Sequence, residues 1–434
     1  MNRYAELSEE CGKSELDLFT RPKLQTEIDE SIYTRVNPIT STANSDSPIE
    51  FVVPGSANLF LDPSQVFLHL KASIKKDNGS SDIANGYGVY PEKGFLYSAF
   101  KNCEIYLNDT LVNSSCNLYP FRSHIQTLLN YSNEAKSGFL AAAGYYGNID
   151  RDAHVEKFKK SRDKIFEVYG RIYSDILQQE RLLLNGVDMK IKLVRSDARF
   201  CIKTSDDATL PYGYLHPIIL EASLYVRRVK ISPSKQLAIE RELDKSNALY
   251  PITKIEPKML NISAGLTVAE LANISLGTIP NKVVVCLVDH KAVNGDYRRS
   301  GLEFHHNNLT SVALYVNGNV TSPPYEMKYS RTDSALSLCA RAYMNMHIVS
   351  GCEDELGSGI SLEDFAERTN LYIFNLSPDL NCCNDFSYTS PTTQAALSLR
   401  LTFAEPTPQP LSVLLLYESN AIIEITKSRQ VLFD

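Results

Sequence analysis

Short runs of alternating apolar and polar residues are the feature that most constrains the fold of this chain. Within 65–74 (QVFLHLKASI), one face would carry Val66, Leu68, Leu70, Ala72 and Ile74, and the other Phe67, His69, Lys71 and Ser73. A period of two residues marks a β-strand that buries one face. The alternation recurs at 189–193, 222–226, 312–316 and 397–403. We therefore expect a predominantly antiparallel β protein.

The stretch 94–148 combines strands, a turn and a helix. Cys103, Ile105 and Leu107 alternate with polar neighbours, and a second short strand follows through Leu111 and Val112. Asn108-Asp109 separates the two strands and tolerates positive φ, which suits a tight reversal.

A helix is expected to follow these strands, over 121–131. Tyr119-Pro120 opens it, because the missing N–H of a proline costs nothing in the first helical turn. The helical spacing of its apolar residues gives it a packing face, made of Phe121, Ile125, Leu128 and Leu129. Nothing in 94–148 has the pattern of a catalytic site.

Two correspondences indicate that the second half of the chain repeats the first. Tyr106 to Asp109 (YLND) matches Tyr315 to Gly318 (YVNG), an offset of 209 residues from 106 to 315. Asn317-Gly318 is also the strongest two-residue hairpin signal. The strand around Ile191 matches the strand around Leu399 at an offset of 208. Two nearly equal offsets, close to half of 434 residues, favour a duplicated β-sandwich.

Composition narrows the class of protein. The net charge is −7 at pH 7, whereas proteins that wrap nucleic acid usually carry a basic surplus. We expect no secretory signal at the N-terminus and no membrane span, since the longest apolar runs, such as 411–417, are too short. The nine cysteines are expected to be mostly buried free thiols in a reducing compartment.

A search for active-site patterns yields no catalytic, cofactor-binding or metal-binding residue. Gly12-Lys13-Ser14 lacks the glycine that a phosphate-binding loop needs at position 7, which is Leu7. His305-His306 has no third metal ligand at a supporting distance. The adjacent Cys382-Cys383 is expected to be structural or incidental. We therefore expect a protein that binds a partner or builds a larger structure, and not an enzyme.

Several strings resemble the major capsid protein of Polinton (Maverick) elements and adintoviruses. They are ELDLFTRPKLQTEIDESIYTRVNPITS and SPIEFVVPGS near the start, YLNDTLVNSS and NLYPFRSHIQTLLNYSNEAKS, YSDILQQERLLLNGVDMKIKL in the middle, and LSLRLTFAEPTPQPLSVLLLYESNAIIEI near the end. The resemblance covers about 15–425. As structural signature residues we single out Tyr106, Leu107, Asn108, Asp109, Tyr119, Pro120, Phe121, Arg122, Asn317 and Gly318.

The resemblance implies an all-β fold of two tandem antiparallel jelly-roll sandwiches, a double jelly roll, with a few short helices and long loops. We expect an N-terminal arm at 1–45, a first jelly roll at 46–262 and a second at 263–434. The expected helix over 121–131 would pack beneath the first sandwich, and the arm would tie neighbouring capsomers together.

The function implied by the resemblance is that of a viral major capsid protein. Homotrimers would form pseudo-hexameric capsomers that tile an icosahedral shell around double-stranded DNA, without sequence-specific DNA binding. Expected partners are further copies, penton proteins and minor capsid proteins. The protein would be made in the host cytosol and reside in the virion, with nuclear assembly left open.

Two rival functions remain at this stage. One is a non-enzymatic β-sandwich that binds a receptor or carbohydrate, as a spike or fibre does. The other is a β-sandwich hydrolase or oxygenase, which would need clustered metal ligands.

Overall fold

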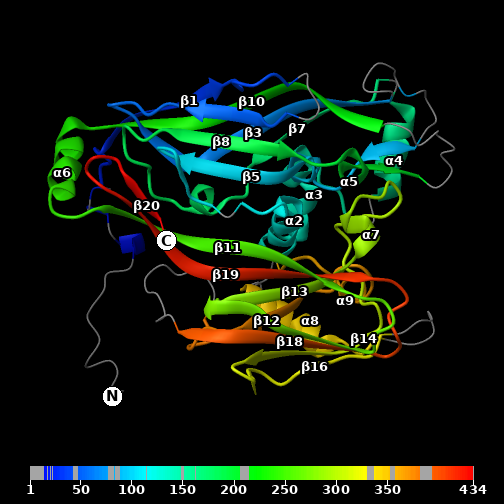
Figure 1. Cartoon of the computed structure of the whole chain (residues 1–434). Helices are drawn as coiled ribbons and strands as arrows, with labels where there is room; N and C mark the ends of the chain where they lie inside the picture. The colour runs from blue at the N-terminus through cyan, green and yellow to red at the C-terminus, as the bar shows by residue number, and fades with distance from the viewer. Residues whose placement is uncertain are drawn as a thin grey trace.

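The computed structural model describes most of the chain. It covers residues 14–433 except 17, 20, 22, 43–46, 77–82, 84–87, 114, 148–150, 162, 206–214, 330–336, 352–356 and 382–392. Within these residues, four large antiparallel sheets stack as two sandwiches, one above the other in Figure 1. We number these sheets 1 to 4 from the top of that view.

The first sandwich consists of sheets 1 and 2. Sheet 1 has the order β1 (Ile28–Val36), β10 (Leu215–Ile231), β3 (Phe60–Lys76) and β7 (Ile165–Arg171). Sheet 2 has the order β2 (Ile49–Val53), β8 (Met189–Arg195), β5 (Phe100–Leu107) and β6 (Thr110–Leu111). A smaller pair joins β4 (Val89–Pro91) to β9 (Ile202–Thr204).

The second sandwich consists of sheets 3 and 4. Sheet 3 has the order β11 (Ala248–Ile262), β19 (Leu411–Ile425), β13 (Lys282–Asp289) and β17 (Tyr372–Asn375), with β20 (Val431–Phe433) paired to β19. Sheet 4 has the order β12 (Val268–Thr278), β18 (Gln394–Phe403), β14 (Leu309–Val316) and β15 (Asn319–Val320), with β16 (Tyr325–Glu326) paired to β14.

The second sandwich repeats the first strand for strand. Sheet 3 has the strand order of sheet 1, and sheet 4 that of sheet 2, so β5 corresponds to β14 and β8 to β18. These are the strands that the two sequence offsets connect, which confirms the predicted duplication. The repeat extends to hydrogen bonds: the Asn108 side chain accepts from the N–H of Asp188 at 2.8 Å, and Asn317 accepts from that of Ala396 at 2.9 Å. Two tandem pairs of antiparallel sheets, each sheet built on a path of four strands, confirm the predicted double jelly roll.

Alternation along the strands explains the two cores. In β3, Leu68, Leu70 and Ala72 are at most 1% exposed while the residues between them reach the other face. In β13 all residues from 283 to 288 are buried, because sheet 3 is covered on both faces. Both patterns agree with the sequence.

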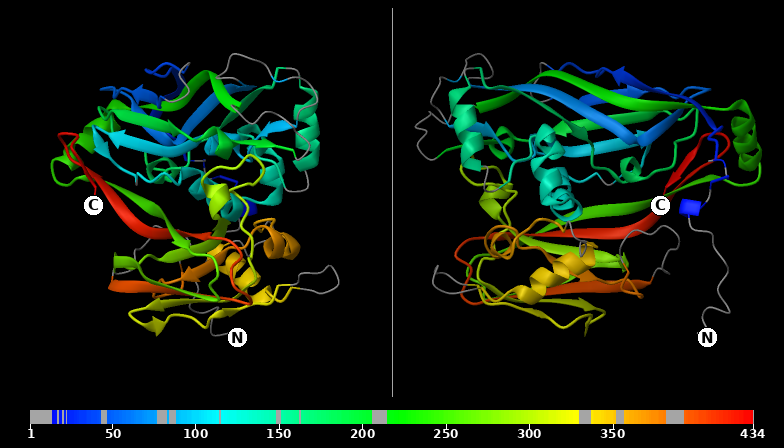
Figure 2. Two further views of the ribbon diagram at one scale, coloured as in Figure 1. Left: turned by 45° about the vertical axis from the view of Figure 1, so that its right-hand side comes forward. Right: turned by 180° about the vertical axis from the view of Figure 1, so that it is seen from behind.

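Nine short helices in the described part of the chain fill the space around the sheets. They are α1 (Phe95–Ser98), α2 (Tyr119–Asn130), α3 (Asn133–Ser137), α4 (Arg151–Lys160), α5 (Ala198–Cys201), α6 (Pro233–Leu243), α7 (His290–Val293), α8 (Ala340–Ser350) and α9 (Leu362–Glu367). Figure 2 shows α6 at one end of the molecule and α8 beside the second sandwich. Ser361 caps α9, since its Oγ accepts from the N–H of Asp364 at 3.0 Å. None of the described helices has the length and apolar character needed to cross a membrane.

The strand pairing suggests other boundaries between the arm and the two jelly rolls than the sequence analysis expected. Residues 28–36, expected within an arm, form β1 and pair with β10 in sheet 1. Residues 248–262, expected in the first jelly roll, form β11 and pair along their whole length with β19 in sheet 3. The alternation of β11 would suit either sandwich, so only its distant partner identifies the sheet. We therefore propose that the two units divide at 232–247, around α6.

Candidate functional site at the junction between the two sandwiches

Helix α2 lies between the two sandwiches and joins their cores (Figure 1). It starts as the sequence predicts, with Pro120 in its first turn. Every residue from Tyr119 to Leu129 is buried, although only one apolar face was expected. Tyr119 packs in the first core, whereas Phe121 and Ile125 pack in the second. The helix therefore packs against both sandwiches and not beneath the first alone.

A buried ion pair fixes α2 to the edge strand of the second sandwich. Arg122 pairs with Asp175, and their side chains are 4% and 0% exposed. Asp175 Oδ1 also accepts from the N–H of Ile255 in β11 at 3.3 Å, and Arg122 Nη1 donates to the Ile255 carbonyl at 3.5 Å. Burial raises the pKa of Asp175, and the charge of Arg122 opposes that rise. The pair thus engages both backbone groups of one residue in the second unit.

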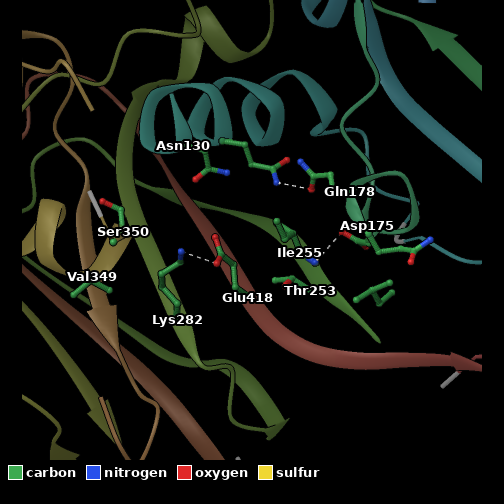
Figure 3. Close-up of a pocket in the computed structure, with 13 residues that line it drawn as sticks. Asn130, Asp175, Gln178, Thr253, Ile255, Lys282, Val349, Ser350 and Glu418 are labelled. Carbon is green, nitrogen blue, oxygen red and sulfur yellow. Dashed lines mark hydrogen bonds and ion pairs between the residues drawn. The ribbon is translucent and has the colours of Figure 1, made fainter. Parts of the chain in front are cut away.

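Next to this pair lies a polar cavity of about 330 Å³ (Figure 3). Gln126 Nε2 donates to Gln178 Oε1 at 3.1 Å on one wall, and Lys282 Nζ lies 2.6 Å from Glu418 Oε2 on the other. The lining side chains that the structure describes include no histidine and no cysteine. Amides and an ion pair on the two walls can hold water or a small polar molecule.

A second set of contacts crosses the junction on another side of α2. Lys136 Nζ donates to the carbonyls of Leu128 at 2.9 Å and of Ser358, in the second unit, at 2.6 Å. The His124 ring lies 5.8 Å from that of Phe304, between centroids, and is buried. Burial, and then the charges of nearby lysines, hold the pKa of His124 well below its usual range.

The signature residues fall in three places. Tyr106 and Leu107 end β5, and Asn108 (φ 43°) and Asp109 (φ 66°) form the turn to β6. Tyr119 to Arg122 form the first turn of α2. Asn317 (φ 50°) and Gly318 (φ 81°) form the equivalent turn at the tip of the second sandwich. Phe121 and Arg122 reach the second unit, as does Asn108, whose Nδ2 donates to the Arg429 carbonyl at 2.7 Å.

The partners of Arg122 were missed by sequence analysis. Asp175 lies 53 residues from Arg122, in a short 3-10 turn (Asp175–Gln178) after β7, and Ile255 is 133 residues away. A single aspartate in YSDILQQE carries no local signal for an ion pair. A buried arginine in the otherwise apolar first turn of a helix is the one hint that an acid must lie opposite.

The histidines considered in the sequence analysis as possible metal ligands make other contacts in the structure. His305 pairs with Glu303 at 3.5 Å, while His306 stacks on Tyr329 with centroids 4.4 Å apart. Although burial opposes ionisation, His305 and nearby arginines lower the pKa of Glu303 to about 2. In the described residues no group of three potential ligands could hold a metal ion. Gly12-Lys13 and Cys382-Cys383 lie outside the described residues.

Comparison with known proteins identifies similar chains but no family model that matches this sequence. An uncharacterized protein from Caenorhabditis elegans, F54H12.2, is 22% identical over 400 residues, spanning 89% of this chain and 93% of that protein.

Solved structures share the fold over nearly the whole chain. A chain from the structure of the Sputnik virophage has a TM-score of 0.65 at 12% identity, over 98% of this chain and 93% of its own. The mavirus major capsid protein has a TM-score of 0.55 at 10% identity, over 98% and 95%. At such identities the similarity shows the fold, which is the double jelly roll of viral capsid proteins.

Proposed function

We propose that this chain is a structural protein that builds a viral capsid. The main support for this proposal is the strand-for-strand duplication of one jelly roll. Buried contacts at the junction, such as the Arg122–Asp175 ion pair, fix the two copies relative to each other. A shell protein needs rigid units with fixed relative positions, since its function is geometric. The similarity to the mavirus major capsid protein over 98% of the chain supports the same reading.

The finer proposal is that three copies form a pseudo-hexameric capsomer. Two similar units per chain give six per trimer, which suits tiling of an icosahedral shell around double-stranded DNA. The specific link to Polinton elements and adintoviruses rests on the sequence strings quoted above. Penton and minor capsid proteins would be the further partners, and the virion the final location.

The native mass of the purified protein tests this proposal first. One chain has a mass of 48.6 kDa, so we expect a species at three times that mass that persists on dilution. Multi-angle light scattering behind size-exclusion chromatography measures it directly. A monomer at every concentration would contradict the capsid proposal and favour the β-sandwich that binds a receptor or carbohydrate.

We further propose that the chain ahead of β1 ties neighbouring capsomers together. Because β1 is part of sheet 1, the arm must end before it, and Glu27 already pairs with Lys235 at 2.7 Å. Deleting residues 1–26 is therefore expected to leave the trimer intact and to impair shell formation. Electron microscopy of particles from the shortened chain and the full chain provides the comparison. Normal shells from the shortened chain would refute the role of the arm.

A further inference from the structure

A second cavity lies within the first unit, beside helix α4. Its volume is about 590 Å³, compared with about 330 Å³ for the cavity at the junction, and it is partly open to solvent. Its walls are α4, the strand β7, and a 3-10 turn (Phe139–Ala143) with the residues that follow it. Figure 1 shows α4 at the end of the first sandwich that lies opposite α6.

Aromatic rings line this cavity on all three walls. Phe95 and Phe166 meet edge to face with centroids 4.8 Å apart, and Phe158 of α4 meets Phe166 in the same way at 5.6 Å. Phe95 belongs to the core of the first sandwich and Phe158 to a small separate cluster, so the cavity lies where two apolar groups meet. Water against such walls finds few hydrogen-bond partners. An apolar group that displaced it would therefore bind favourably.

Helix α4 has a face available for a ligand. Of its ten side chains only Val155 and Phe158 are buried. His154, Lys157 and Ser161 follow one another at intervals of three and four residues, which places them on one side of the helix, and all three line the cavity. Ser161 continues the last turn, since its N–H donates to the Lys157 carbonyl at 3.2 Å. The cavity therefore has a polar stripe on a wall that is otherwise apolar.

The charge available at this stripe is positive. Lys157 and Glu167 are the charged residues among those that line the cavity. Glu167 Oε1 lies 2.5 Å from His69 Nε2, whereas Lys157 is exposed and forms no ion pair with a described residue. Burial, and then the charge of Lys157, lower the pKa of His154 to about 4, so its imidazole is neutral at pH 7. An ammonium beside a hydroxyl and a neutral imidazole supplies hydrogen-bond donors for an anion.

We propose that this cavity binds an amphiphile with one carboxylate and one alkyl chain, of which a fatty acid is the simplest form. The chain would lie between the aromatic walls, and the carboxylate would meet Lys157 on α4. A flexible chain fits better than a flat ring because the lining rings already pair with one another, as His154 does with Tyr146 at 4.3 Å between centroids. The site lies within one unit of one chain, so it does not rest on the proposed assembly.

Isothermal titration of the purified full chain with decanoate tests the proposal. We expect saturable binding of one decanoate per chain. Across octanoate, nonanoate and decanoate the dissociation constant is expected to fall about fourfold with each added methylene, because each is buried in the cavity. With free decanoate at about a hundred times its dissociation constant, the equilibrium constant for unfolding is expected to fall about a hundredfold.

The head group is tested with ligands that have the same chain. Decanoate is expected to bind more tightly than 1-decanol and decylammonium. K157Q is expected to weaken decanoate binding by about two- to fivefold and to leave 1-decanol binding unchanged. K160Q is the matched control, since Lys160 is an exposed residue of α4 that does not line the cavity. Equal binding of the three ligands, or tighter binding of decylammonium, would overturn the assignment of a carboxylate.

Two further variants block the cavity from opposite walls. A141F and A153F place a ring at exposed positions that line it, and both are expected to abolish saturable binding. A142F is the control, because Ala142 is exposed on the same 3-10 turn but does not line the cavity. Circular dichroism confirms that the variants are folded. Unchanged binding by A141F and A153F, or no saturable binding by the wild type, would refute the site, whereas the capsid proposal depends only on the native mass.

Discussion

Replacing Arg122 by methionine is expected to lower the free energy of unfolding by about 3–5 kcal/mol, because it leaves the carboxylate of Asp175 buried without its partner. The Ile255 carbonyl also loses the Arg122 donor. Denaturation in urea, followed by circular dichroism, measures the change. Tyrosine emission gives a second probe, since the chain has 24 tyrosines and no tryptophan.

The double variant R122M/D175L shows whether the loss comes from the pair. Removing both charges leaves no uncompensated ion, so the double variant is expected to lose less stability than R122M alone. Arg400 offers a matched control, because it pairs with Glu270 at 3.5 Å with side chains 49% and 70% exposed. R400M is expected to cost less than about 1 kcal/mol. If R122M cost no more than R400M, the junction would not depend on this pair.

A comparison of Arg122 with the strands shows which parts of the structure can be predicted from the sequence. Strand patterns are local: alternation along β3 indicates which side faces the core, and the continuous apolar run of β13 indicates burial on both faces, so these strands are predictable. The ion pair of Arg122 depends on Asp175, which only tertiary folding brings near. The same holds for β11, whose pattern indicates a strand but whose partner β19 lies far along the chain. Local periodicity therefore predicts elements, while the junction between the units depends on contacts that no local pattern records.

The burial of α2 on all sides has the same origin. From sequence, its apolar residues form one face, and residues such as Arg122, His124 and Gln126 look suited to solvent. In the structure the second sandwich covers them too, so each needs a partner: Gln126 finds Gln178, and Arg122 finds Asp175. Polar residues on a buried helix thus mark where the two units meet, and His124 is the one among them whose unperturbed pKa lies near neutrality.

Acidification below pH 6.5 is expected to destabilise the folded chain through His124. The groups that face its ring are Lys93 and Lys136, which oppose a further positive charge, and Glu303, which favours one. Burial and the lysines dominate, so the folded pKa of His124 lies well below the usual value of about 6.5. In this range the unfolded chain binds the proton and the folded chain does not. The contribution of His124 to the free energy of unfolding is therefore fully present above pH 6.5. Below pH 6.5 it is lost, by up to about 1.4 kcal/mol per pH unit.

The variant H124Q removes this titration and keeps a polar side chain at the site. Between pH 6.5 and 5.5 its free energy of unfolding is expected to fall less steeply than that of the wild type, by up to about 1.4 kcal/mol per pH unit. H305Q is the opposite control. Glu303 raises the pKa of His305, so that histidine favours the folded state at low pH, and removing it should steepen the fall. Parallel curves for wild type and H124Q would show that His124 takes up a proton in the folded chain as readily as in the unfolded one, and the junction would then not be the acid-sensitive part of the molecule.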